Sequence, residues 1–183
     1  MAKKVLILLA GGFEEVEAVT PIDYLRRAGI EVNTVAVGAS KTVTGAHGLP
    51  VLADFTLGEL APAASDGILL PGGMPGASNL AASGETGALL RELAGAGKLV
   101  AAICASPAVV LAPLGLLQNR RFTCYPGMEA QVKDAHWSEE NVVIDGNLIT
   151  SRGAGTAGPW AVAIIGKLLG EAQGEKVARS VLL

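Results

Sequence analysis

Cys104 is the residue of this chain best suited to act as a nucleophile. The apolar run Lys98–Ile103 is typical of a buried strand and ends at this cysteine, and the small residues Ala105 and Ser106 follow before Pro107. On a tight strand-to-helix turn, free N–H groups and partial positive charge would lower the thiol pKa below about 8.5. The alternative is a buried thiol that packs as a small hydrophobic side chain.

Glu17 is a candidate acid–base partner for such a thiol. It lies three residues after Glu14 in an expected helix that starts at the sheet edge, so one helix face can turn inward. A carboxyl group there could hydrogen-bond the sulfur and transfer protons, and a neighbouring thiolate would raise its pKa. The alternative is a solvated carboxylate, which is what we expect of Glu14 and Glu15.

Gly72 and Gly73 follow another apolar run, Gly67–Leu70, after Pro71. Beside a nucleophile, glycines let backbone N–H groups approach a reacting oxygen and stabilise it as an oxyanion. The alternative is an ordinary turn after a strand.

Short apolar runs alternate with amphipathic stretches, which is typical of a mostly parallel sheet flanked by helices. The expected strands are Val5–Ala10, Val32–Val37, Gly67–Leu70, Leu99–Ile103, Val142–Ile144 and Leu148–Thr150, with a hairpin outside the main sheet in Thr42–Ala53. The expected helices are Glu14–Ala28, Glu85–Ala94, Ala105–Leu111, Thr156–Leu169 and Glu175–Leu182.

Four loops of unusual composition follow strands in this prediction: Gly11–Glu17, Pro71–Gly76, Cys104–Pro107 and Ser151–Gly153. Ligands of open α/β sheets bind beyond the carboxyl ends of the parallel strands. The four loops are therefore expected to form a single pocket.

The bulk composition narrows the class of protein. The chain has 183 residues, half of them apolar and 17% charged, with a formal net charge of −3, which predicts a single α/β domain over residues 1–183. No clustered basic face is evident, so no nucleic-acid partner is expected. The apolar opening is too short for a signal peptide and no run could span a bilayer, so we expect a cytoplasmic protein without membrane contact.

The two cysteines, twenty positions apart, predict neither a disulfide framework nor a metal site. Cys124 lies in the β-rich stretch Phe122–Tyr125 and is expected to be an inert packing residue.

The stretches GGFEEVEAVTPIDYLRRAGI, LLPGG, AAICASP and ITSRGAGT occur in this order between Val5 and about Leu169. In them the chain closely resembles the ThiJ/PfpI superfamily, in the branch of the parkinsonism-associated protein deglycase. The resemblance implies a flavodoxin-like three-layer α/β sandwich, a homodimer and a reactive cysteine on a strained turn. The matching positions are Cys104 for the nucleophile and redox-sensitive thiol, Glu17 for its carboxyl partner, Gly72, Gly73 and Ala105 for the backbone lining, and Arg152 near the pocket rim.

The histidines depart from the family pattern. Tyr125 stands where a family member has a histidine, so Tyr125 becomes a candidate pocket residue. His47 falls where the branch often has an arginine, close to the expected dimer contact, and His136 is expected at the surface. Ala105 stands where the protease and chaperone branches have a histidine, so a Cys-His peptidase triad is not expected.

The resemblance implies an enzyme that uses no cofactor and acts on methylglyoxal-type dicarbonyls, or on their early adducts with protein and nucleotide groups. Its expected role is defence against carbonyl and oxidative stress. Glyoxalase and deglycase activity are both left open. The alternative is a non-catalytic redox sensor or chaperone whose Cys104 oxidises to a sulfinate.

Overall fold

The computed structural model describes residues 3–60 and 65–183, and its elements follow the predicted alternation. The strands are β1 (Lys4–Leu9), β2 (Glu31–Ala36), β3 (Thr42–Thr44), β4 (Pro50–Leu52), β5 (Phe55–Thr56), β6 (Gly67–Leu70), β7 (Leu99–Ile103), β8 (Arg121–Phe122), β9 (His136–Trp137), β10 (Val142–Asp145) and β11 (Leu148–Ser151). The α-helices are α1 (Glu15–Arg27), α2 (Gly76–Ala82), α3 (Gly84–Gly95), α4 (Ala157–Leu169) and α5 (Glu171–Ser180).

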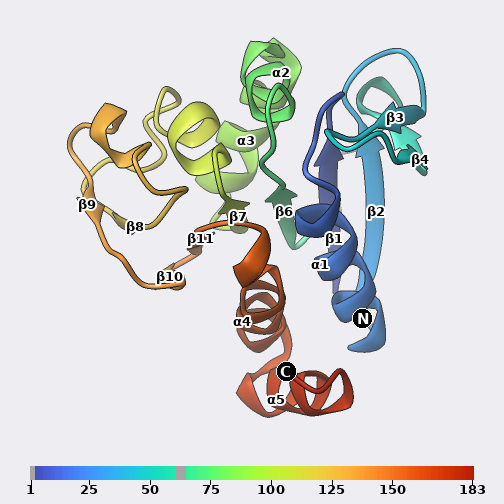
Figure 1. The fold of residues 1–183 in the computed structure, drawn as a ribbon, viewed down its shortest axis with the longest axis vertical. Helices are drawn as coiled ribbons and strands as arrows, with labels where there is room; N and C mark the ends of the chain where they lie inside the picture. The colour runs from blue at the N-terminus through green and yellow to red at the C-terminus, as the bar shows by residue number, and fades with distance from the viewer. Residues whose placement is uncertain (1–2, 61–64) are drawn as a thin grey trace.

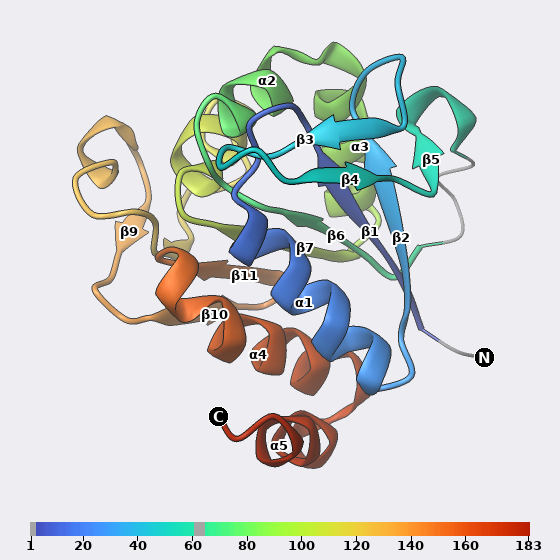
Figure 2. The same ribbon diagram turned by 45° about the vertical axis from the view of Figure 1, so that its right-hand side comes forward.

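A seven-stranded sheet in the order β10-β11-β7-β6-β1-β2-β5 forms the centre of the protein (Figure 1). Its neighbouring strands run parallel except for β10 and β11, which form the antiparallel hairpin expected from the sequence. Figure 2 shows α1 and α4 side by side over one face, with α5 beyond α4. Helices α2 and α3 cover the other face, so the predicted flavodoxin-like three-layer sandwich is confirmed.

Strand β1 separates two hydrophobic cores. Val5, Ile7 and Leu9 belong to the core that α1 and α4 complete, whereas Leu6 and Leu8 belong to the core beneath α2 and α3. Side chains alternate across a strand, so a strand that is covered on both faces is apolar throughout. The continuous apolar run in β1 therefore reflects its central position.

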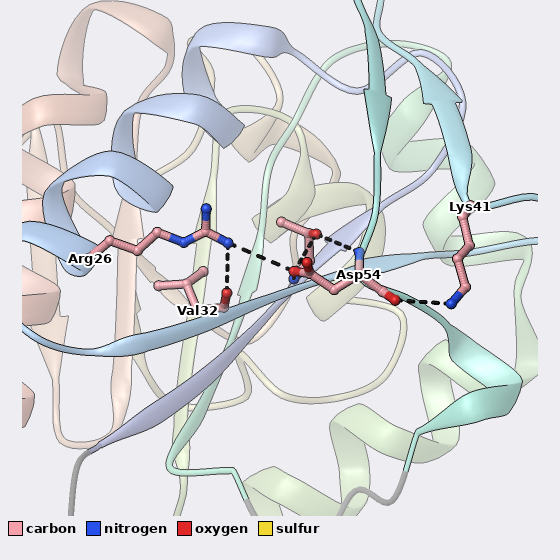
Figure 3. A network of polar contacts seen from close by, with 5 residues as sticks. Arg26, Val32, Lys41 and Asp54 are labelled. Carbon is pink, nitrogen blue, oxygen red and sulfur yellow. Dashed lines mark hydrogen bonds and ion pairs between the residues drawn. The ribbon is translucent and has the colours of Figure 1, made fainter.

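Asp54 ties the segment before β5 to β2 and α1 (Figure 3). Its Oδ2 accepts hydrogen bonds from the amide and hydroxyl of Thr34, each 2.8 Å long, and lies 3.7 Å from Arg26 Nη2. Arg26 also donates to the Val32 carbonyl, and Lys41 donates to the Asp54 carbonyl, both over 3.0 Å. Arg26 lies in the last turn of α1, so these contacts hold that end of the helix against β2.

The structure differs from the prediction mainly in short elements. The helix expected over Ala105–Leu111 is a five-residue π-helix, Pro107–Leu111. The helix α2, the two-residue strand β5 and the parallel pair of β8 and β9 were not expected. Segments this short bury too few residues to show a periodicity, and tertiary pairing decides them.

None of the helices within the described residues is both long and apolar enough to cross a membrane.

Candidate active site

The four loops singled out in the sequence meet at one edge of the sheet. They follow β1, β6, β7 and β11, which are consecutive neighbours in the sheet and all run parallel. Their carboxyl ends therefore lie together, where open α/β sheets bind ligands.

Cys104 has left-handed backbone geometry, with a φ of 62°. This conformation is strained for a residue with a Cβ and persists only where the surroundings impose it. Its N–H donates to the Ser151 carbonyl over 3.0 Å, and its carbonyl accepts from the Tyr125 N–H over 2.8 Å. The neighbouring Ser106 hydroxyl donates to the Pro71 carbonyl over 2.5 Å. Contacts to three other segments thus hold the strained turn.

Glu17 is buried, with 1% of its surface exposed. The backbone of Gly72 holds the start of α1 in place, because the Gly72 N–H donates to Glu17 Oε2 over 2.8 Å and the Gly72 carbonyl accepts from the Glu14 N–H over 2.9 Å. A Cβ at Gly72 would lie 2.6 Å from the Cβ of Cys104 and 2.8 Å from Glu17 Oε2. Only glycine allows the two side chains to approach this closely.

The Glu17 carboxyl group and the Cys104 side chain meet at Gly72, since Cys104 Cβ and Glu17 Oε2 lie within 2.8 Å of the same point, and each group shifts the pKa of the other. Burial raises the pKa of Glu17 from 4.5 to about 7, with a further contribution from the charge of Glu14, against the opposing effect of the Gly72 N–H. Glu17 can therefore both hold and release a proton near neutral pH, which is what a general acid–base group requires.

The expectation of a lowered thiol pKa is wrong. Burial first, and then the negative charge of Glu17, raise the pKa of Cys104 to about 12. The π-helix that follows has only five residues, and the amides of Gly73 and Ala105 offset only part of the burial effect. The resting sulfur is a thiol, so it could act as a nucleophile only after a base has taken its proton.

The backbone amides divide into two roles. Those of Gly73 and Ala105 lie close enough to the Cys104 sulfur to lower the pKa of its thiol. The Gly72 amide, expected to face a reacting oxygen, instead donates to Glu17. Gly73 has a φ of 85°, and a Cβ there would collide with the Glu14 backbone. Gly72 therefore positions the carboxyl group, and the two amides at the sulfur remain for an oxyanion.

Tyr125 and Arg152 lie in different surroundings. Tyr125 is joined to Cys104 through its backbone, and 53% of its surface is exposed. The Arg152 guanidinium donates to the Glu139 carbonyl over 2.9 Å and so braces the segment before β10. Tyr125 keeps its place as a candidate pocket residue, whereas the contact of Arg152 indicates a supporting role.

Cys124 is buried, with 1% of its surface exposed, and its thiol contacts the Tyr125 carbonyl at 3.5 Å. Burial raises its pKa to about 12, so a raised pKa is common to both thiols. They differ in access and in backbone geometry, because Cys104 is only partly buried and lies on the strained turn.

Comparisons with known proteins identify the family. The DJ-1/PfpI family profile matches residues 3–167. The chain therefore belongs to the DJ-1/PfpI family.

Several members of the family are similar over most of this chain. Protein dj-1beta of Drosophila melanogaster is 38% identical, covering 100% of this chain and 98% of that protein. Deglycase PH1704 of Pyrococcus horikoshii is 35% identical over 81% of this chain and 89% of its own length. Protein DJ-1 homolog B of Arabidopsis thaliana is 39% identical, and the chain spans only 41% of that longer protein.

Solved structures of the family confirm the fold. A cysteine-to-alanine mutant of the DJ-1 superfamily protein STM1931 from Salmonella typhimurium has a TM-score of 0.95 at 39% identity, with 98% of each chain covered. An oxidised DJ-1 from Toxoplasma gondii has a TM-score of 0.96 at 39% identity, covering 99% of this chain and 98% of that one.

His47 lies against the first turn of α1. Its Nδ1 is 2.9 Å from Glu15 Oε2 and 3.5 Å from Glu14 Oε2, while Glu15 Oε1 accepts from the His47 amide over 2.7 Å. The expectation of a solvated Glu15 is thus wrong, because only 8% of its surface is exposed. The three side chains could offer atoms to a metal, but their contacts are those of a hydrogen-bonded ion pair, and we interpret them as one.

No local signal in the sequence could have revealed this ion pair, because His47 is 32 residues from Glu15 and reaches it only when the β3–β4 hairpin folds over α1. His136, on β9, is exposed, as expected.

Proposed function

We propose that this protein is a cofactor-independent enzyme that converts methylglyoxal-type dicarbonyls to 2-hydroxy acids in carbonyl stress defence. The observation that carries the proposal is the close approach of Glu17 and Cys104 at Gly72, which brings a buried carboxyl group with a pKa of about 7 next to a thiol held on a strained turn. Its similarity to a relative named as a deglycase supports chemistry on aldehydes or their adducts.

The first step is attack on the aldehyde carbon. Ionised Glu17 takes the thiol proton as the Cys104 sulfur bonds to the carbon, and the carbonyl electron pair moves onto oxygen. The Gly73 and Ala105 amides, which face the sulfur, stabilise the resulting oxyanion. Protonated Glu17 then returns the proton to this oxygen, which gives a hemithioacetal.

The second step moves hydrogen between the two former carbonyl carbons. Glu17 removes the proton from the sulfur-bearing carbon to form an enediol and delivers it to the neighbouring carbon, so one carbon is oxidised as the other is reduced. The product is a thioester of a 2-hydroxy acid. Water cleaves it and frees the Cys104 thiol, so methylglyoxal plus water gives lactate without an external oxidant.

The same steps extend to early adducts of dicarbonyls. A hemithioacetal or hemiaminal on a protein or nucleotide group releases its aldehyde reversibly, and consumption of that aldehyde restores the free group. Removal of adducts from glycated substrates therefore follows from the glyoxalase reaction without further catalytic groups.

Lactate formation from methylglyoxal, measured with an enzymatic assay that distinguishes it from buffer-catalysed loss of the aldehyde, tests the proposal. We expect steady-state turnover that continues beyond one equivalent per chain. A rate of lactate formation equal to that of the blank without protein would contradict the proposed enzymatic function.

A redox sensor is the second candidate, and the surroundings of the sulfur favour it specifically. The Gly73 and Ala105 amides and a protonated Glu17 can donate hydrogen bonds to sulfinate oxygens. Two equivalents of peroxide would convert the thiol to the sulfinate and be reduced to water. We expect intact-mass spectra to show a gain of about 32 Da in wild type, and Glu17→Ala to accumulate less of this species. Equal accumulation in both proteins would count against the role of Glu17.

We also propose that the protein is a homodimer in the cytoplasm. Val16 and Val19 on α1 and Leu49 and Leu52 at the β3–β4 hairpin are exposed hydrophobic side chains, and α1 and the hairpin face the same side in Figure 2. A second copy would cover such a surface. Sedimentation velocity should give the mass of a dimer for wild type and the mass of a monomer for Val19→Glu. A monomeric wild type at micromolar concentration would contradict the proposed dimer. Cell fractionation tests the location.

A further inference from the structure

One peptide group of the site takes part in two hydrogen bonds. The Pro71 carbonyl accepts from the Ser106 hydroxyl over 2.5 Å, and the Gly72 N–H donates to Glu17 Oε2 over 2.8 Å. The carbonyl and the N–H belong to the same planar trans peptide unit, in which the C=O and N–H bonds point in opposite directions. The Pro71–Gly72 peptide group therefore connects the Ser106 hydroxyl to the Glu17 carboxyl group.

The Ser106 hydroxyl does not serve the helix that Ser106 precedes. Ser106 lies directly before the π-helix Pro107–Leu111, at a position where a serine hydroxyl commonly accepts from an amide of the helix. Its side chain makes no such capping bond and donates to the Pro71 carbonyl instead. Ser106 has no exposed surface and Pro71 is also buried, so water cannot easily take the place of the hydroxyl.

The Pro71–Gly72 peptide group depends on hydrogen bonds for its orientation. The proline ring fixes the φ of Pro71, but Gly72 has no side chain and can adopt backbone angles that other residues avoid. Because the peptide group is planar, a donor on the Pro71 carbonyl also fixes the direction of the Gly72 N–H. In a buried site the same bond polarises the peptide group and makes its N–H a stronger donor.

We propose that Ser106 is a positioning residue, which aims the Gly72 N–H at Glu17 and strengthens it as a donor through the Pro71–Gly72 peptide group. A stronger donor favours the ionised carboxylate, which is the form that accepts the thiol proton in the first step of the proposed reaction. The consequence for turnover rests on the proposed function, whereas the effect on Glu17 does not.

Titration of Glu17 tests this role without turnover. The Gly72 N–H and the Cys104 side chain lower the pKa of Glu17, against burial and the charge of Glu14, which raise it. Ser106→Ala weakens the Gly72 donor and should raise the pKa of Glu17 by roughly 0.5, or about threefold in proton affinity. Carbon NMR of protein labelled at the glutamate carboxyl carbons measures this pKa, and the loss of one signal in Glu17→Gln assigns it.

Two further variants separate positioning from packing. Ser106→Thr keeps the hydroxyl and should return the pKa of Glu17 toward the wild-type value. Ser65→Ala is the matched control, because Ser65 is also buried but its hydroxyl has no hydrogen-bond partner among the described residues, and it should leave the pKa of Glu17 unchanged. Thermal unfolding checks that each variant folds, and Ser106→Gly, which also lacks the hydroxyl, decides the outcome if Ser106→Ala does not fold.

Turnover provides the second readout. The pH at which kcat/KM for methylglyoxal levels off should rise in Ser106→Ala by the same amount as the pKa of Glu17 and should return in Ser106→Thr.

An unchanged or lowered pKa of Glu17 in Ser106→Ala overturns the inference, as does an equal rise in Ser65→Ala or the lack of recovery in Ser106→Thr. Absence of turnover in wild type counts against the proposed function, and the titration then decides the role of Ser106 by itself.

Discussion

Glu15 and Glu17 lie two residues apart in the first turn of α1, and both are buried, yet their pKa values shift in opposite directions. Burial raises the pKa of Glu17 to about 7. Burial acts on Glu15 in the same sense, but hydrogen bonds from the His47 side chain and from the His47 and Leu49 amides outweigh it, so the pKa of Glu15 is lowered.

The difference shows that the hydrogen-bond partners of a carboxyl group affect its pKa more than its depth of burial does. Glu15 faces a hairpin that supplies the His47 imidazole and amide donors, and it remains ionised as part of the structure. Glu17 faces a thiol and one amide, so its charge is poorly compensated and its proton is available near neutral pH. One helical turn thus carries a structural carboxylate and a carboxyl group that exchanges its proton near neutral pH.

Loss of either reactive group should have the largest effect on turnover. Cys104→Ser and Glu17→Gln should each lower lactate formation from methylglyoxal by ~10²–10⁴-fold or more, since positioned acid–base catalysis is worth this much. The double variant should be no worse than the poorer single variant, because the two groups act as a unit. Glu15→Gln should remain close to wild type, and a loss as large as that of Glu17→Gln would break the distinction between the two carboxyl groups.

Turnover should also depend on pH through Glu17. Ionised Glu17 accepts the thiol proton, so kcat/KM for methylglyoxal should rise with pH and level off above the pKa of about 7. His47→Ala should keep this rise at nearly the same pH. A pH profile that is flat between about pH 5.5 and 8 would show that Glu17 is not the base.

The two glutamine substitutions should change the free energy of unfolding at pH 8 in opposite directions. The pKa of Glu17 is raised on folding, so its contribution is fully present below the unfolded value of 4.5 and is lost as pH rises through about 7. Glu17→Gln should therefore stabilise the protein at pH 8 by up to about 3 kcal/mol and have little effect near pH 4.5.

The pKa of Glu15 is lowered, so its contribution is present above 4.5 and is lost as pH falls through the folded value. Glu15→Gln should therefore destabilise the protein at pH 8, by about 0.5–1 kcal/mol. Urea unfolding at fixed protein concentration measures the free energy of unfolding of both variants. A change of the same sign for both at pH 8 would contradict the distinction between Glu15 and Glu17.

Substitution of His47 is expected to have the smallest effect on turnover. Its hydrogen bond with Glu15, aided by the charge of Glu14, raises the pKa of His47 above 6.5, and NMR titration should show this value fall in Glu15→Gln. The contribution of the protonated imidazole is fully present below 6.5, as long as Glu15 remains ionised, and it is lost as pH rises through the raised pKa of His47. His47→Ala should leave turnover nearly intact, and a large loss would assign His47 a catalytic role.

Tyr125→Phe tests whether the phenol assists Glu17. The Tyr125 N–H donates to the Cys104 carbonyl, and more than half of the surface of Tyr125 is exposed. We expect only a small loss of turnover, since water can reach this position. A loss comparable to that of Glu17→Gln would make the phenol an acid–base group.

Much of the fold could be predicted because its signals are local. A strand covered on both faces is apolar throughout, as in β1 and β7, and a helix over a core repeats its buried residues, as in α1 and α4. Once four such strands are parallel neighbours, the loops at their carboxyl ends must meet. For this reason the placement of Cys104, Glu17 and the Gly72–Gly73 loop at one edge could be inferred from residue types and order alone.

The sequence by itself therefore determined the sandwich, the edge at which the four loops meet and the two residues, Cys104 and Glu17, that we propose to react. Only the tertiary structure decided the electrostatics of that pair. The thiol pKa is raised because burial and Glu17 outweigh the amides of Gly73 and Ala105, and the Gly72 amide is committed to Glu17. Solvent exclusion and hydrogen bonding depend on atoms that lie tens of residues apart in the chain, and no local pattern of residues records which of them will come into contact.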